Sequence, residues 1–154
     1  MDIINTDIVK SAQDIFWQEM PDYGILSAKP VLVLSAPFAA GGPEEEQLNG
    51  ILRSGCQLTE GQYNVLQLQA GEQVAWHKLR ETLQPKVVLL FNVIPSQLGI
   101  ASLFRLNEIN RFDSSFWVPT FSLAQVIEDK NVKGNLWNNA LKPLFVGKVH
   151  GTLV

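Results

Sequence analysis

The chain has 154 residues, of which 46% are hydrophobic, 12 are Lys or Arg and 15 are Asp or Glu, so its formal net charge is −3. This length and composition predict one soluble globular domain over residues 1–154. The net charge and the scattered basic residues argue against strong direct binding to nucleic acid. The lone Cys56 excludes a disulfide framework. Because we find neither a charged-then-apolar leader nor an apolar run long enough to cross a membrane, we expect a cytoplasmic protein of bacterial type.

The N-terminal segment has the apolar spacing of a helix. Thr6 can cap it and Pro21 can end it, which predicts a helix over residues 6–20. Its apolar positions are Ile8, Ala12, Ile15, Phe16 and Met20. Trp17 stands beside this stripe rather than within it, and exposed aromatic side chains on a terminal helix often mark a partner surface. We therefore expect Phe16 and Trp17 to bind a partner, with ordinary packing of the helix on the sheet as the alternative.

The rest of the chain alternates apolar runs with segments of helical periodicity. Val31–Leu34 and Val87–Phe91 are continuous apolar runs, as expected of strands covered on both faces. In chain order the pattern predicts strand 31–34, helix 43–55, strand 63–68, helix 73–83, strand 87–91, strand 116–118 ending at Pro119, and a final helix with apolar positions from Val132 to Phe145. This order predicts an α/β fold: a three-layer α/β/α sandwich around a central, mainly parallel four-stranded sheet.

The candidate chemistry is sparse. Thr120-Phe121-Ser122 follows a predicted strand, where α/β proteins place their reactive groups, yet it offers only two hydroxyl groups and a phenyl ring. His77 and His150 have no second histidine or cysteine at ligand spacing, so we expect no metal site and no cofactor. Cys56 lies near the end of a predicted helix, which favours a buried and inert thiol over a nucleophile.

The order of elements from Val31 to Phe145 resembles the uracil-DNA glycosylase superfamily, particularly its compact bacterial branches. Leu34-Ser35-Ala36-Pro37 falls where that family has a strand leading into an acidic-Ala-Pro-Gly loop. Trp76 to Val88 is similar to the family's Trp, Leu and Pro-Lys-Val-Ile lead-in to a strand. Thr120-Phe121-Ser122 lies where the family has His-Pro-Ser. The resemblance implies a glycosylase-like fold with a base pocket beside these loops.

The departures from the family pattern affect the groups that base excision needs. Ser35 stands at the acidic position, Phe38 at the glycine, Gln67 at the base-reading Asn, and the catalytic-loop His is absent. Excision requires a group that positions water, a reader for the flipped base and a donor for its developing charge. The resemblance therefore implies no catalytic residue and a vestigial base pocket, which we expect the rings of Phe38 and Phe121 to fill. Its members are Ser35, Ala36, Pro37, Phe38, Gln67, Thr120, Phe121 and Ser122.

A narrower resemblance accounts for the loss of these groups. Ser122-Leu123-Ala124-Gln125-Val126, followed by Lys133, Leu136-Trp137 and Leu141, is similar to the C-terminal signature of the psi subunits of bacterial DNA polymerase III. These subunits are non-enzymatic relatives with the same fold, and an N-terminal peptide of theirs binds the clamp loader. The resemblance implies a non-catalytic adaptor whose partner is a clamp-loader or another replisome subunit.

Two other functions remain open from the sequence. The first is a divergent glycosylase-type repair enzyme that uses Ser35, Gln67 and Thr120 in unfamiliar roles. The second is a small-molecule binding domain that uses the former base pocket. A pocket filled by Phe38 and Phe121 would argue against both.

Overall fold

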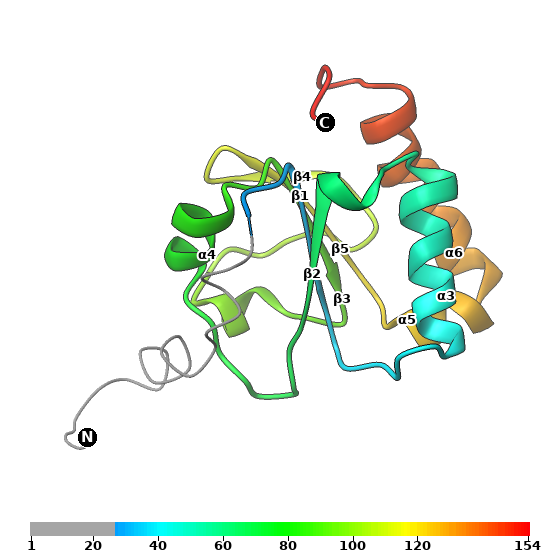
Figure 1. Ribbon diagram of the computed structural model, residues 1–154, viewed down its shortest axis with the longest axis horizontal. Helices are drawn as coiled ribbons and strands as arrows, with labels where there is room; N and C mark the ends of the chain where they lie inside the picture. The colour runs from blue at the N-terminus through cyan, green and yellow to red at the C-terminus, as the bar shows by residue number, and fades with distance from the viewer. Residues whose placement is uncertain (1–26) are drawn as a thin grey trace.

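The computed structural model describes residues 27–154. The predicted helix 6–20, with the candidate partner-binding residues Phe16 and Trp17, lies outside the described residues. Figure 1 shows a central sheet with helices on either side of it. Within the described range, no helix is long and apolar enough to cross a membrane.

The sheet is mostly parallel, as predicted, but it has five strands rather than four. Its strand order is β2-β1-β3-β5-β4, in which the first four strands run parallel and β4 is antiparallel to β5. The strands are β1 (Val31–Ser35), β2 (Tyr63–Gln67), β3 (Val87–Phe91), β4 (Asn110–Phe112) and β5 (Ser115–Thr120). The additional strand, β4, is a three-residue edge strand with the sequence Asn-Arg-Phe, which carries too few apolar residues to be recognised from the pattern.

Helices cover both faces of the sheet (Figure 1). One face carries α3 (Pro43–Asn49), the π-helical η1 (Gly50–Gly55), α5 (Leu123–Glu128), α6 (Lys130–Leu136) and the π-helical η4 (Trp137–Val146). The other face carries α4 (Trp76–Leu83) and the short 3-10 helix η3 (Pro95–Leu98). A single 3-10 turn, η2 (Glu60–Gln62), precedes β2.

Alternation along the central strands explains the two-sided core. In β1, Val31 and Val33 pack under the α3 and α6 layer, whereas Leu32 and Leu34 pack under α4. Successive side chains of a strand point to opposite faces, so a strand between two helical layers must be apolar at every position. The predicted apolar stripes of the helices are buried as expected: Leu48, Ile51, Leu52, Trp76, Leu79, Leu83, Val132, Leu136, Ala140, Leu141, Leu144 and Phe145.

Helix η1 contacts η4 closely at Gly55. A Cβ atom at Gly55 would lie 3.2 Å from Cζ3 of Trp137, closer than ordinary van der Waals contact. The indole therefore occupies the space that a larger residue at position 55 would need. Gly55 also ends η1, as the sequence predicts.

The last parallel strand extends one residue beyond the predicted end at Pro119. The carbonyl of Pro119 accepts a hydrogen bond from the N–H of Asn107 at 2.8 Å, so the backbone polar groups of Pro119 point away from β3. The β4 strand reaches only as far as Trp117 along β5. The missing N–H of Pro119 therefore costs no hydrogen bond of the ladder, which is why a proline fits here.

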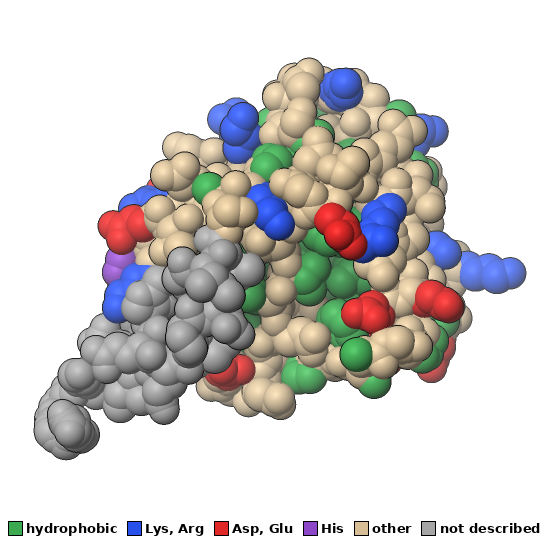
Figure 2. Space-filling view, in the orientation of Figure 1, with side chains coloured by type: hydrophobic (Ala, Val, Ile, Leu, Met, Phe, Trp, Pro, Cys, Tyr) green, Lys and Arg blue, Asp and Glu red, His purple; other side chains and the backbone are tan. Residues whose placement is uncertain are grey.

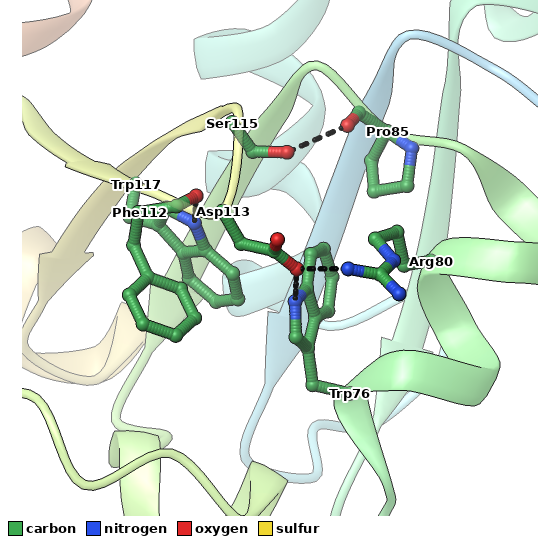
Figure 3. A network of polar contacts seen from close by, with 7 residues as sticks. All are labelled: Trp76, Arg80, Pro85, Phe112, Asp113, Ser115 and Trp117. Carbon is green, nitrogen blue, oxygen red and sulfur yellow. Dashed lines mark hydrogen bonds and ion pairs between the residues drawn. The ribbon is translucent and has the colours of Figure 1, made fainter.

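The hairpin between β4 and β5 is fixed to α4 by a carboxylate (Figure 3). The Trp76 indole donates to Oδ2 of Asp113 at 2.7 Å, and the Arg80 guanidinium donates to the same oxygen at 2.6 Å. The hydrogen bond from Trp76, followed by that from Arg80, lowers the pKa of Asp113. At the other side of the hairpin, Ser115 donates to the Pro85 carbonyl at 2.9 Å.

Four aromatic rings pack where α4 meets the hairpin. Trp76 lies edge-on to Trp117 with ring centroids 4.6 Å apart. Phe104, from the segment between η3 and β4, packs against Trp117 at 5.4 Å and against Phe112 at 5.9 Å. This cluster attaches the segment around Phe104 to the sheet.

Candidate functional site

The sequence-predicted site residues lie along the carboxyl ends of the parallel strands. The last rung of the ladder runs across the sheet through Gln67, Ser35, Phe91 and Thr120, which are paired in register. Parallel register therefore brings Ser35 and Gln67 together, and it places Thr120 on the same rung with Phe91 between them. The rung presents an amide, a hydroxyl, a phenyl ring and a second hydroxyl.

Ser35 and Gln67 make hydrogen bonds to the backbone of the loop after β1. The Ser35 hydroxyl, on a residue only 2% exposed, donates to the carbonyl of Ala36 at 2.8 Å. The Gln67 side-chain oxygen accepts from the N–H of Phe38 at 3.0 Å. Ala36 in turn donates its N–H to the Phe91 carbonyl at 3.0 Å. These bonds hold the loop against the sheet, so both polar groups have structural partners.

Thr120 is paired with a residue that the sequence analysis did not single out. Its hydroxyl donates to Oδ1 of Asn107 at 2.6 Å, and both residues are buried. Asn107 has φ of +58°, a left-handed conformation that Asn adopts more readily than most residues. Only its residue type hinted at this role, because its partner lies thirteen positions away in the chain. Asn107 therefore joins the loop before β4 to the end of β5.

Ser122 and Pro37 complete the predicted set without adding reactive chemistry. The Ser122 side chain accepts a hydrogen bond from the N–H of Gln125 at 3.2 Å and so caps α5. Pro37 is exposed in the loop after β1.

The filling of the vestigial base pocket by Phe38 and Phe121 stays a prediction. Phe38 and Phe121 are both partly buried against the core on the α3 and α6 side. Phe121 also lines a cavity of about 540 Å³ beyond the ends of β3 and β5, and Phe38 does not. The cavity is open, and of the eight predicted residues only Thr120 and Phe121 line it.

This cavity is built from side chains that the sequence analysis missed. Its wall is formed by the segment after β3, including Asn92, Val93 and Ile100, and by Phe104. Three large apolar side chains on its rim are exposed: Ile94 by 59%, Leu103 by 97% and Leu106 by 51%. One feature of the sequence could have indicated this cavity: residues 87–104 and 114–127 contain no Asp, Glu, Lys or Arg.

None of His77, His150 and Cys56 lines this cavity. His77 is exposed on α4, and His150 stacks on Phe116 with ring centroids 4.5 Å apart, near the opposite end of β5. Burial raises the pKa of the Cys56 thiol to about 12. Among residues 27–154 no group of three or more His, Cys, Asp or Glu side chains is arranged to hold a metal ion.

The basic side chains do not form a single patch on the face shown in Figure 2, where Lys and Arg are spread among neutral and acidic residues. Nucleic-acid binding surfaces concentrate such charges on one face or along one groove. No such concentration is visible on this face.

No protein-family model matches this chain, and no curated protein matches it significantly.

Proposed function

We propose that this chain is a glycosylase-like domain that acts as a non-catalytic adaptor of a bacterial replication complex, similar to the psi subunit of DNA polymerase III. The observation that carries the proposal is the contrast at one edge of the sheet. The polar groups on the last rung are bonded within the protein, and beside them lies an uncharged cavity with exposed apolar side chains.

The hydrogen bonds argue against base excision. A group that positions water needs a free acceptor directed at the attacking water, but the Ser35 hydroxyl is buried against the Ala36 carbonyl. A base reader needs a free amide, but the Gln67 oxygen is bonded to the Phe38 N–H. Thr120 cannot replace the family's His as a donor while its proton is held by Asn107. Ser35, Gln67 and Thr120 thus each hold a loop in place.

The apolar rim supports binding to protein. Soluble domains seldom expose contiguous apolar patches, and such patches often mark interaction sites. The cores of protein interfaces are also depleted in charge and enriched in aromatic residues, as at Phe104 and Phe121.

The assignment to replication rests on the psi resemblance, and the local structure is compatible with it. The segment from Leu123 to Trp137 forms α5, a turn at Asp129, and α6 continuing into η4. The resemblance implies this succession of short helix, turn and Leu-Trp helix. Asp129 caps α6 by accepting from the N–H groups of Asn131 and Val132.

A uracil-release assay separates the adaptor from the alternative, a divergent uracil-DNA glycosylase. The full chain is incubated with single-stranded and double-stranded uracil DNA, and free uracil is measured against a buffer control. We expect no release above the control. Turnover by the wild type that disappears in Ser35→Ala or Gln67→Ala would establish a glycosylase and overturn the proposal.

A further inference from the structure

We propose that the cavity at the ends of β3 and β5 binds an extended, apolar peptide segment of the partner protein that also carries a carboxylate. The peptide would pair with the backbone of residues 101–104, place apolar side chains in the cavity and direct its carboxylate to Arg105. This inference rests on the proposed adaptor function and specifies the chemistry of the partner.

The first observation is an irregular stretch of backbone, residues 101–104, without hydrogen-bond partners among the described residues. The N–H and C=O groups of residues 101–104 form no hydrogen bond to any other residue in the described part of the chain. Ala101, Ser102 and Leu103 are exposed, and the segment has no helical or sheet structure of its own. Unpaired, accessible backbone beside an apolar pocket fits recognition by strand addition, where main-chain bonds supply affinity and pockets for side chains supply specificity.

The second observation is that the segment is held in place at both ends. Before it, the Ile100 N–H donates to the Pro95 carbonyl at 3.1 Å. After it, the Arg105 N–H donates to Oδ1 of Asn110 at 2.9 Å, and the Asn110 amide donates to the Arg105 carbonyl at 3.0 Å. The Phe104 ring is packed against Phe112 and Trp117. A segment fixed in this way loses little conformational entropy when a peptide binds.

The third observation concerns shape and apolar surface. The cavity volume of about 540 Å³ lies within the range of ligand pockets, roughly 300–1,000 Å³. Leu103 is 97% exposed next to this cavity, although burying a leucine side chain is favourable. An apolar peptide side chain that covers Leu103 and enters the cavity would remove the Leu103 side chain and the cavity wall from water.

The fourth observation is charge. The cavity lining contains no charged residue, and Arg105 lies in the chain between two lining residues, Phe104 and Leu106. Among the described residues its ion-pair partner is Glu108, at 3.9 Å, and both side chains are largely exposed. A guanidinium so weakly paired, on the residue between cavity-lining Phe104 and Leu106, favours a ligand that brings its own carboxylate.

The test begins with an unbiased selection. The full chain is immobilised, and a phage library of random dodecapeptides is selected for binding after subtraction on Leu103→Asp. We expect enriched peptides with apolar residues at alternating positions and an adjacent Asp or Glu. Helical spacing of the apolar residues, absence of enrichment, or enrichment of sequences like residues 1–26 of this chain would overturn the proposal. The last outcome would identify the chain's own N-terminus as the occupant.

The selected peptide then tests the binding mode by fluorescence anisotropy. Leu103→Asp should weaken binding about tenfold or more, whereas the matched control Val149→Asp should not change it. Val149 is also exposed, and it lies in the C-terminal tail close to His150, which stacks on β5 at its opposite end. Methylation of successive peptide nitrogens should weaken binding at every second position, because alternate N–H groups of a paired strand face its neighbour. Uniform sensitivity to methylation would refute strand pairing.

A charge exchange tests the role of Arg105. Arg105→Glu should weaken binding of the acidic peptide and restore binding of a peptide whose acid is replaced by Lys. If Arg105→Glu affects both peptides equally, Arg105 does not recognise the carboxylate. Failure of these peptide tests would overturn the docking mode alone. The adaptor function is tested separately, by isolating the native complex with the wild-type chain.

Discussion

Replacing Asp113 and Arg80 in turn should show how much stability each of two hydrogen bonds contributes, the bond from Trp76 and the bond from Arg80. These two bonds join the β4–β5 hairpin to α4. Asp113→Ala leaves the indole N–H of Trp76, a residue only 6% exposed, without its acceptor, which costs about 1–3 kcal/mol. Asp113 also has φ of +52°, which alanine tolerates less well than Asp or Asn. In contrast, Arg80→Ala removes only a partly exposed ion pair, worth about 0–1 kcal/mol. For a domain of this size we expect the melting temperature to fall by about 3–10 °C in Asp113→Ala and by less than about 3 °C in Arg80→Ala.

Asp113→Asn is the matched control because it retains an oxygen acceptor and the left-handed backbone. It should lie between the wild type and Asp113→Ala at pH 7. Since the pKa of Asp113 is lowered in the folded protein, the stability due to its charge is fully present above the unfolded pKa of about 3.9. The difference between wild type and Asp113→Asn should shrink as the pH falls through the folded pKa. Thermal melts followed by circular dichroism measure this. Equal destabilisation by Asp113→Ala and Arg80→Ala, or a difference that grows in acid, would refute the reasoning.

Three further predictions concern accessible chemistry and binding. With a pKa of about 12 and a buried side chain, Cys56 should not react with a thiol reagent at pH 8 until the protein unfolds, and rapid reaction of the native protein would contradict its burial. Duplex DNA should bind more weakly than about 1 µM at physiological salt, and a tighter complex with a steep salt dependence would show a concentrated basic surface. The double variant Phe16→Ala with Trp17→Ala should lose partner capture without a change in melting temperature. A fall of several degrees would instead show that this segment packs on the core.

The parts of the fold that could be predicted from the sequence are those that a packed core specifies. Val31–Leu34 and Val87–Phe91 are apolar at every position because each is covered on both faces. Trp76, Leu79 and Leu83 follow helical spacing because α4 buries one face.

The parts that could not be predicted depend on partners far away in the chain. The short strand β4 exists because it pairs with β5, and its own sequence has no strand pattern. Asp113 reads as an ordinary turn residue, and only the folded chain brings Trp76 and Arg80, more than thirty positions earlier, to its carboxylate. Asn107 is similar, because its buried bond to Thr120 depends on how two loops meet.

The candidate site follows the same division. Parallel strands align their carboxyl ends, so Ser35, Gln67 and Thr120 could be expected at one edge, and they share one rung. Which loop each side chain would bond could not be inferred, because those bonds depend on backbone conformation after the strands. The cavity beside Leu103 was missed for the same reason, since it arises in an irregular segment without periodicity.

Isolation of the native complex tests the central claim of a non-catalytic adaptor most directly. The full chain is tagged, expressed at its natural level in the source cell and purified gently, and its partners are quantified by mass spectrometry. We expect clamp-loader or other replisome subunits in fixed stoichiometry with the chain, resistant to nuclease treatment because the contacts are between proteins. Recovery of the chain alone, or of replisome subunits only while DNA is intact, would contradict the account.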